Sequence, residues 1–194
     1  MKILLLNGAQ SFGHAGGKLN NTLHQIAFKQ LVELGHQIQE THIETGYQEE
    51  QEVTKMLWAD IVIYQMAGWW MSTPWKMKKY MDEVYTAGQG KLYQDDGRTR
   101  TAPSKQYGTG GLLQDHKYML SVTWNAPQEA FEQFGNFFDG RGVDGVYFTF
   151  HKAQQFLGLT ALPSFIANDV IKKPNIEATI AAYTNHLKQV IGKA

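Results

Sequence analysis

The sequence predicts an α/β fold in which five parallel strands form one sheet with helices on both faces. Short apolar runs alternate along the chain with longer segments whose apolar residues recur at helical spacing. The run Ile61-Val62-Ile63-Tyr64 is apolar without alternation, which is typical of a strand buried on both faces of a parallel sheet. The 194 residues suffice for one such domain, so a single domain is expected over residues 1–194.

The amino-terminal half contains three predicted strand–helix pairs. Gly35 ends the first helix, as a glycine does when it follows the last helical turn. Pro74 suits the first turn of the third helix, because its fixed φ fits there and no N–H bond is lost. The predicted elements are a strand at 2–6, a helix at 19–34, a strand at 37–43, a helix at 52–58, a strand beginning at 61 and a helix at 74–87.

The carboxy-terminal half begins with a polar, glycine-rich stretch at 88–111, and so long a loop in a compact domain is usually functional or disordered. A strand is expected at 117–123. Residues 143–157 fit either a strand or a helix; we predict a helix, because parallel strands need a right-handed crossover element between them. The remaining expected elements are a short helix or coil at 130–138, a strand at 163–169, and a helix opening at Pro174 with Ile176, Ile180, Tyr183, Leu187 and Ile191 on its inner face.

The composition excludes several classes of function. Lysine plus arginine equals aspartate plus glutamate, 18 each, so no net charge draws the chain to nucleic acid or to an anionic membrane. The absence of cysteine excludes disulfides and thiolate chemistry. Neither a signal peptide nor an apolar run long enough to span a bilayer is apparent, so a cytoplasmic protein is expected.

Metal and hydrolase chemistry also find little support. The histidines are scattered without a recognisable ligand spacing, so no metal site is predicted. A G-x-S-x-G nucleophile motif is missing as well.

Three loops follow predicted strands, and the carboxyl ends of parallel strands share one edge of a sheet, where ligands bind. The loop at 8–22 is glycine-rich and leads into a helix, an arrangement that binds phosphate, although it matches neither the Walker nor the GxGxxG pattern. The loops GWWM at 68–71 and TWNA at 123–126 offer aromatic walls and backbone amides. One phosphate loop with two loops for a planar ring predicts a flavin site.

Each of these candidate residues also has an interpretation that involves no ligand. The two tryptophans of the GWWM loop can be core residues, and His14 and Lys18 can be surface residues instead of phosphate ligands. Asn20 and Thr22 lie in the first helical turn, where side-chain oxygens often cap the helix. Tyr107 can donate its hydroxyl to the ring or face solvent.

The segments GWWMSTPWKMKKYMD, DGRTR, PSKQYGTGGL, SVTWNAP and FIANDVIKKP resemble the NAD(P)H:quinone oxidoreductases of the modulator-of-drug-activity-B type, within the flavodoxin-like quinone reductase superfamily. The resemblance spans nearly the whole chain. It implies a flavodoxin-like fold, FAD, two-electron reduction of quinones by NADPH or NADH, and a homodimer. The implied FAD contacts are Ala15, Gly16, Gly17, Lys18, Leu19, Asn20, Asn21, Thr22, Gly68, Trp69, Trp70, Met71, Tyr107, Thr123, Trp124, Asn125 and Ala126. His14, which can donate to a phosphate, is a further expected cofactor-binding residue.

Ping-pong hydride transfer is the expected mechanism, and it needs no side-chain nucleophile. Tyr107 is the expected catalytic hydrogen-bond donor, with Trp70, Met71 and phenylalanines of 131–150 lining the substrate side. The resemblance also shows a departure, since Ala15-Gly16 stands where a hydroxyl residue occurs in some relatives, leaving backbone N–H contacts there. Two alternatives remain open: an FMN-dependent azo- or nitroreductase of the same fold, and a flavodoxin-like electron carrier without turnover. Such carriers tend to be strongly acidic, unlike this chain.

Overall fold

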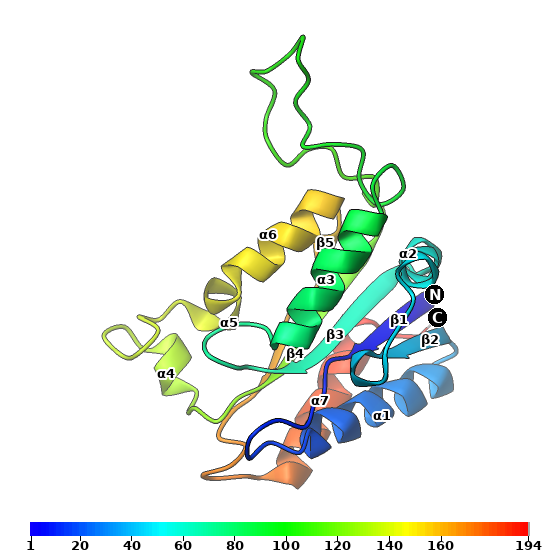
Figure 1. Cartoon of the computed structure of the whole chain (residues 1–194). Coiled ribbons are helices and arrows are strands. Elements are labelled where there is room, and N and C mark those ends of the chain that lie inside the picture. Colours follow the sequence, from blue (N-terminus) through cyan, green and yellow to red (C-terminus); the bar gives the residue numbers. More distant parts are fainter. Residues whose placement is uncertain (194) are drawn as a thin grey trace.

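The computed structural model describes residues 1–193 and contains one parallel sheet. The strand order is β2-β1-β3-β4-β5, and a further short strand, β6, also pairs with β4 (Figure 1). The strands are β1 (Lys2–Asn7), β2 (Gln37–His42), β3 (Ile61–Ala67), β4 (Lys117–Thr123), β5 (Thr160–Ala161) and β6 (Phe165–Ala167).

The expected fifth strand at 163–169 is therefore only partly correct. It is observed as β6, and β5 precedes it along the same side of β4. Pro163 lies between the two and has no backbone N–H to donate to the sheet, so the pairing is interrupted there.

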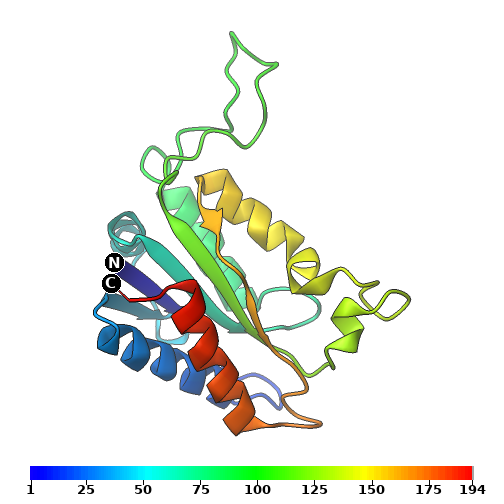
Figure 2. The ribbon, with the colours of Figure 1, turned by 180° about the vertical axis from the view of Figure 1, so that it is seen from behind.

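Helices cover both faces of the sheet, as predicted. α1 and α7 pack on one face, and α2, α3 and α6 pack on the other (Figures 1 and 2). Among the described residues, no helix combines the length and apolar character that crossing a bilayer requires. The helices are α1 (Lys18–Glu33), the 3-10 helix η1 (Ile43–Thr45), α2 (Glu49–Trp58), α3 (Trp75–Ala87), α4 (Glu129–Glu132), α5 (Gly142–Val146), α6 (Phe148–Leu157) and α7 (Ile176–Val190).

The central strands β1 and β3 are buried on both faces, which confirms the interpretation of their unbroken apolar runs. Leu4 and Tyr64 contribute to the core beneath α2, α3 and α6, whereas Leu5 and Ile63 contribute to the core beneath α1 and α7. Successive side chains point to opposite faces of a strand, so a strand with helices on both sides needs apolar residues at every position.

Residues 143–157 form helices, as the crossover argument predicts. α5 and α6 together span nearly all of this segment, and the amide of Gln154 on α6 accepts a hydrogen bond of 2.9 Å from the buried Tyr64 hydroxyl. In α7, Tyr183 and Leu187 are buried as expected, but Ile176 is 43% exposed, which corrects its placement on the inner face. Ile176 is the first residue of α7, before the helix reaches the sheet.

The connection from residue 88 to residue 116 extends away from the body of the molecule (Figure 1). α3 runs antiparallel to the strands, so its last residue, Ala87, lies at the edge where the strands begin. Hydrogen bonds anchor the base and middle of the connection, including Leu112 N–H to the Leu92 carbonyl at 2.9 Å and Gly108 N–H to the Asp96 carbonyl at 2.7 Å.

Candidate flavin site

A cavity of about 300 Å³ lies at the carboxyl ends of β1, β3 and β4. The three loops that follow these strands line it together, with Gly17, Trp69 and Asn125 each contributing from a different loop. The predicted convergence is therefore confirmed. The predicted site residues that line the cavity are His14, Ala15, Gly16, Gly17, Lys18, Leu19, Asn20, Gly68, Trp69, Thr123 and Asn125.

The β1–α1 loop presents the amino terminus of α1 to this cavity. Gly17 precedes the helix with φ +66°, a left-handed conformation that favours glycine, and a Cβ there would lie 3.3 Å from the Ala9 methyl group and from the Gln10 backbone. No side chain caps the helix, and its first turn holds no acidic residue. The first N–H groups and the positive end of the helix dipole are thus available to an anionic group such as a phosphate.

Asn20 joins three elements under the cavity. Its side-chain amide donates to Thr123 Oγ1 at 2.9 Å and its carbonyl accepts from Gln65 Nε2 at 2.8 Å. Gln65 Oε1 in turn accepts from Ser121 Oγ at 2.8 Å. All four side chains are buried, so this network holds α1 against β3 and β4. Asn20 does not cap the helix; it fixes the position of the helix terminus relative to the sheet.

Replacing Asn20 with alanine is expected to destabilise the fold by about 1–3 kcal/mol, because buried donors and acceptors lose their partners. Urea denaturation measures this change. Thr22→Ala is the matched control: the Thr22 hydroxyl is exposed and donates to the Lys18 carbonyl within the same helix, so its loss should change stability by less than about 0.5 kcal/mol. Equal stabilities for the two variants would contradict the role of the network.

Gln10 is a site residue that sequence reasoning missed. Its side chain is buried and lines the cavity, yet both its Oε1 and Nε2 lack a hydrogen-bond partner in the described structure. Buried polar atoms are rarely left unpaired, so this amide is suited to a bound polar ligand. A lone glutamine in a loop gives no sequence signal, and only its burial beside the cavity identifies it.

The GWWM segment forms a tight turn after β3. Trp69 and Ser72 exchange backbone hydrogen bonds of 3.0 and 3.1 Å, while Trp70 and Met71 adopt φ values of +45° and +61°. Two consecutive non-glycine residues in this conformation cost about 1–3 kcal/mol each, and such strain is concentrated at functional sites. The Trp69 ring lies 5.2 Å from Phe12 and 5.4 Å from Trp75 between ring centroids, joining this turn to the β1–α1 loop.

Trp70, by contrast, is 91% exposed and Met71 is 44% exposed, and neither lines the cavity. The alternative that both tryptophans are core residues is therefore wrong, since Trp69 lines the cavity and Trp70 projects outward.

Trp124 lies behind the cavity and does not line it. Its indole packs edge-on against Phe131, Phe138 and Tyr147, with ring centroids 5.3 to 5.8 Å apart. Burial raises the pKa of Tyr147, so this residue stays a neutral phenol, and its hydroxyl donates to the Ser72 carbonyl at 3.4 Å. Trp124 and Tyr147 therefore support the GWWM turn from inside the protein.

The segment after β6 closes the cavity. Asn125 Oδ1 accepts hydrogen bonds from the N–H groups of Ile171 at 3.3 Å and Lys172 at 3.1 Å. Val170 and Ile171 line the cavity, although only Asn125 was predicted as a ligand-binding residue. Asn21 and Ala126 are adjacent in sequence to lining residues, and Thr22 follows Asn21, but none of the three lines the cavity.

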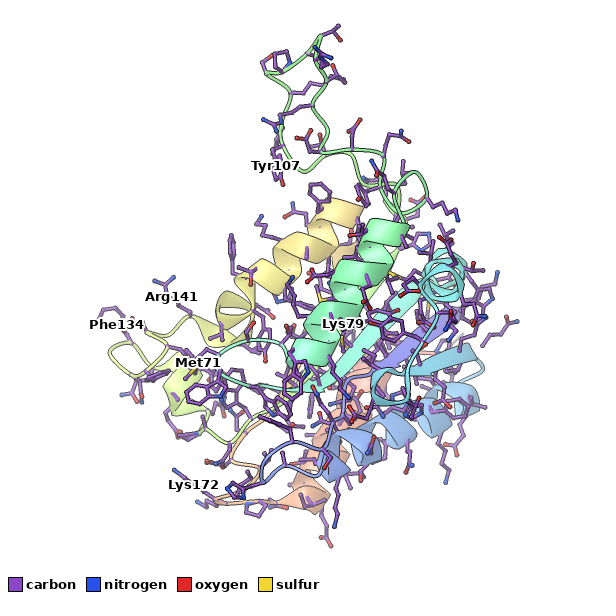
Figure 3. All side chains as sticks on the ribbon, viewed as in Figure 1. Met71, Lys79, Tyr107, Phe134, Arg141 and Lys172 are labelled. Atoms are coloured by element: carbon purple, nitrogen blue, oxygen red, sulfur yellow. The ribbon has the colours of Figure 1, made fainter. Side chains whose placement is uncertain are left out.

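The structure does not bring Tyr107 to the cavity within one chain. Tyr107 lies on the extended connection, 65% exposed, with its ring centroid 5.7 Å from that of Phe156 and 5.3 Å from the Arg98 guanidinium. Figure 3 shows it near the top of the molecule, at the opposite end from Lys172, with Met71 between them. Tyr107 precedes β4, so it lies near the edge of the sheet where this strand begins. The cavity lies at the other end of β4, which is seven residues long and therefore spans roughly 20 Å.

Comparisons with known proteins agree with this architecture. A family model described as a flavodoxin-like fold matches residues 1–191. A solved azoreductase from Bacillus anthracis superposes with a TM-score of 0.68 at 15% identity, covering 98% of each chain. The NAD(P)H:quinone oxidoreductase from Methanothermobacter marburgensis superposes with a TM-score of 0.65 at 13% identity, covering 97% of this chain and 94% of that one. At these identities the likeness concerns the fold.

Two relatives are much closer in sequence. An uncharacterized protein of Schizosaccharomyces pombe is 59% identical over 194 residues, covering all of this chain and 99% of that protein. The NADPH:quinone oxidoreductase MdaB of Haemophilus influenzae is 56% identical over 192 residues, covering 99% of this chain and all of that protein. The chain therefore belongs to the flavodoxin-like quinone oxidoreductase family that includes MdaB.

Proposed function

We propose that the protein is an FAD-dependent NAD(P)H:quinone oxidoreductase that transfers two electrons as a hydride by a ping-pong mechanism. The observation that carries the proposal is the convergence of an uncapped helix terminus, a strained aromatic turn and an unpaired buried amide on one cavity. The relative from Haemophilus influenzae, 56% identical and named as an NADPH:quinone oxidoreductase, supports the same reaction.

The residues present fit a flavin. The first N–H groups of α1 and the nearby Lys18 suit its phosphate groups, and the Gln10 amide supplies an unused donor and acceptor. Trp69 and Gly68 line the part of the cavity suited to the planar ring. When bound, the flavin supplies a ring that takes a hydride from NADPH or NADH and passes it to a quinone in a second, separate step.

The protein's own groups perform the remaining tasks. Trp69, Val170 and Ile171 give the cavity an apolar lining, and displacing water from this lining when a ligand binds strengthens hydrogen bonds to any charge that develops there. Trp70 and Met71 project from the turn beside the cavity, where they can contact an aromatic substrate. None of these tasks requires a side-chain nucleophile.

A homodimer is the second part of the proposal. Trp70, Phe134 and Phe137 are 91%, 89% and 67% exposed, and large apolar side chains exposed to this degree are suited to contact with another chain. Tyr107 projects on the extended connection (Figure 3). In a dimer, it can reach the cavity of the other chain. In this arrangement each active site combines the cavity of one chain with Tyr107 of the other.

Purification of the full chain without a tag tests the cofactor and the activity. We expect a yellow protein whose extracted cofactor has the mass of FAD, and NADPH oxidation that depends on added quinone. Parallel lines in double-reciprocal plots would support the ping-pong order. Extracted FMN would instead favour the azoreductase alternative, and bound flavin without steady-state turnover would favour the electron carrier. A colourless protein that added FAD does not convert to an active form would refute the proposal.

Tyr107→Phe is expected to lower kcat by at least about tenfold while leaving flavin occupancy unchanged, because one hydrogen-bond donor to developing charge is lost. Tyr93→Phe, on the same connection, is the control and should keep wild-type activity.

Mixing chains tests where Tyr107 acts. When Tyr107→Phe and Gly68→Ala chains are co-expressed in equal amounts, half of the dimers are mixed, and one site in each mixed dimer is intact if Tyr107 acts across the interface. About one quarter of the wild-type activity should then return. No recovery above the separate variants would contradict a shared site.

A further inference from the structure

A cluster of potential metal ligands lies outside the flavin cavity, between α1 and the edge strand β2. His24 projects from α1, while Glu40 and His42 project from β2 two residues apart and therefore on the same face of that strand. These histidines are scattered along the sequence, which predicted no metal site. The packing of α1 against β2, seen in Figure 1, brings them together.

The distances between the three ligand atoms suit a metal ion. Glu40 Oε2 lies 2.9 Å from His24 Nε2 and 3.6 Å from His42 Nε2, and all three atoms lie within 4.8 Å of one another. Ligands at about 2.0–2.2 Å from a tetrahedral zinc ion are about 3.3 Å apart, so the two measured contacts bracket the required spacing. Small side-chain rotations can therefore place all three atoms around one ion.

The chemistry of the donors favours a transition metal over calcium or magnesium. Two imidazoles and one carboxylate are a ligand set that zinc and similar divalent ions prefer, and three protein ligands leave a fourth position open. Among the described residues, the ion pairs of the Glu40 carboxylate are with these two imidazoles alone, without lysine or arginine. His24 is 2% exposed whereas Glu40 and His42 are about 40% exposed, so the cluster has a rigid inner ligand and an open outer side.

We propose that His24, Glu40 and His42 form a binding site for a divalent transition-metal ion of the zinc type. The site is separate from the flavin cavity and does not depend on the proposed quinone reductase activity.

The contact between His42 and Asn7 sets the expected affinity. Asn7 Oδ1 accepts from the Ala9 N–H at 2.9 Å, so its amide nitrogen faces His42 Nδ1 at 3.1 Å, and Nδ1 accepts this hydrogen bond. An ion bound at His42 Nε2 requires the ring proton to lie on Nδ1, where the Asn7 amide cannot accept it. The ion therefore replaces the Asn7–His42 hydrogen bond, which lowers its affinity for the wild-type chain.

This conflict makes Asn7→Asp a discriminating variant. A carboxylate at position 7 can accept the Nδ1 proton and orient the ring, as second-shell carboxylates do for metal-bound histidines. Its other oxygen can keep the hydrogen bond from the Ala9 N–H. In the wild type, Asn21 Oδ1 accepts from Asn7 Nδ2 at 2.8 Å. If the Asn21 side-chain amide turns by 180°, its NH2 group can donate to the new carboxylate instead. We expect Asn7→Asp to bind zinc about tenfold or more tightly than the wild type.

Calorimetric titration of the untagged full chain with ZnCl2 is the experiment. We expect one saturable equivalent of zinc, and an affinity that falls by more than about tenfold in His42→Ala and in Glu40→Gln. His186→Ala is the control, because His186 lies on α7 with its ring bonded to the Pro163 carbonyl, and it should bind zinc as the wild type does. Circular dichroism establishes that each compared variant is folded. His42 is 43% exposed, so its replacement is expected to leave the fold intact.

Three results would overturn the proposal. The first is the absence of saturable zinc binding by the wild-type chain. The second is zinc binding that is equal in the wild type, His42→Ala and Glu40→Gln, which would place the ion elsewhere. The third is a zinc affinity that Asn7→Asp leaves unchanged or weakens, which would reject His42 Nε2 as a ligand. All three readouts are independent of flavin content and of quinone reduction.

Discussion

Gly68→Ala is expected to reduce the flavin content of the purified protein by more than about tenfold and to lower its thermal midpoint. A Cβ at position 68 would lie 2.0 Å from Trp124 Cε3, which is a severe clash. The atom that it meets belongs to a rigid indole ring, so the rotation of a flexible side chain cannot relieve the clash. Trp124 is held by three aromatic rings, so either the indole or the GWWM turn must move. Overpacking of this kind costs about 1–3 kcal/mol, and each 1.4 kcal/mol lost in binding is a factor of ten.

The ratio of flavin absorbance to protein absorbance and a thermal melt measure the two effects. Gly16→Ala is the matched control for stability, because it adds the same methyl group at the same cavity, where the nearest atom beyond its chain neighbours is Lys18 Cγ at 3.9 Å. Its midpoint should remain near that of the wild type. A Gly68→Ala protein with wild-type flavin content and midpoint would show that Trp124 does not constrain the turn.

Glu52→Ala is expected to destabilise the fold by about 3–5 kcal/mol, because it breaks a buried ionic network. The Glu52 carboxylate is 2% exposed and accepts hydrogen bonds from the Thr41 hydroxyl at 2.8 Å and the Tyr80 hydroxyl at 2.9 Å. Its other oxygen pairs with Lys55 Nζ at 2.7 Å. Burial and the neighbouring carboxylate raise the pKa of Tyr80, so this phenol stays protonated and would lose its acceptor in the variant.

Urea denaturation measures the difference in unfolding free energy. Glu50→Ala is the control on the same helix: Glu50 is exposed and pairs with Lys91 at 3.1 Å, so its loss should cost less than about 1 kcal/mol. Similar urea midpoints for Glu52→Ala and Glu50→Ala would refute the structural role of the buried carboxylate. This network binds β2 to α2 and α3, on the face opposite His24 and His42.

Much of the fold was predictable because local patterns specify it. The unbroken apolar run at Ile61 predicted a strand buried on both faces, and Gly35 and Pro74 marked helix ends. The ambiguous segment 143–157 needed a topological argument, since its pattern fits both periods, and that argument was right. The division of the last strand into β5 and β6 was not foreseen, although Pro163 is a visible reason for it.

The candidate site was only partly predictable. Gly17, Trp69 and Asn125 were expected at one edge because each follows a parallel strand, and the structure places them there. Gln10 was missed because an unpaired buried amide is defined by its surroundings. Tyr107 was linked to the cavity by its motif, but the direction of α3 carries it to the other edge of the sheet.

The sequence by itself determined the alternation of strands and helices, the parallel sheet and the edge on which a ligand would bind. Those features depend on the spacing of apolar residues and on turn residues that act over a few positions. Only the tertiary structure decided that Asn20 hydrogen-bonds α1 to the sheet beneath the cavity, that Trp124 supports a strained turn, and that His24 lies close to Glu40 and His42. Such contacts join residues far apart in the chain, and their geometry follows from helix packing and strand register, which short-range patterns do not encode.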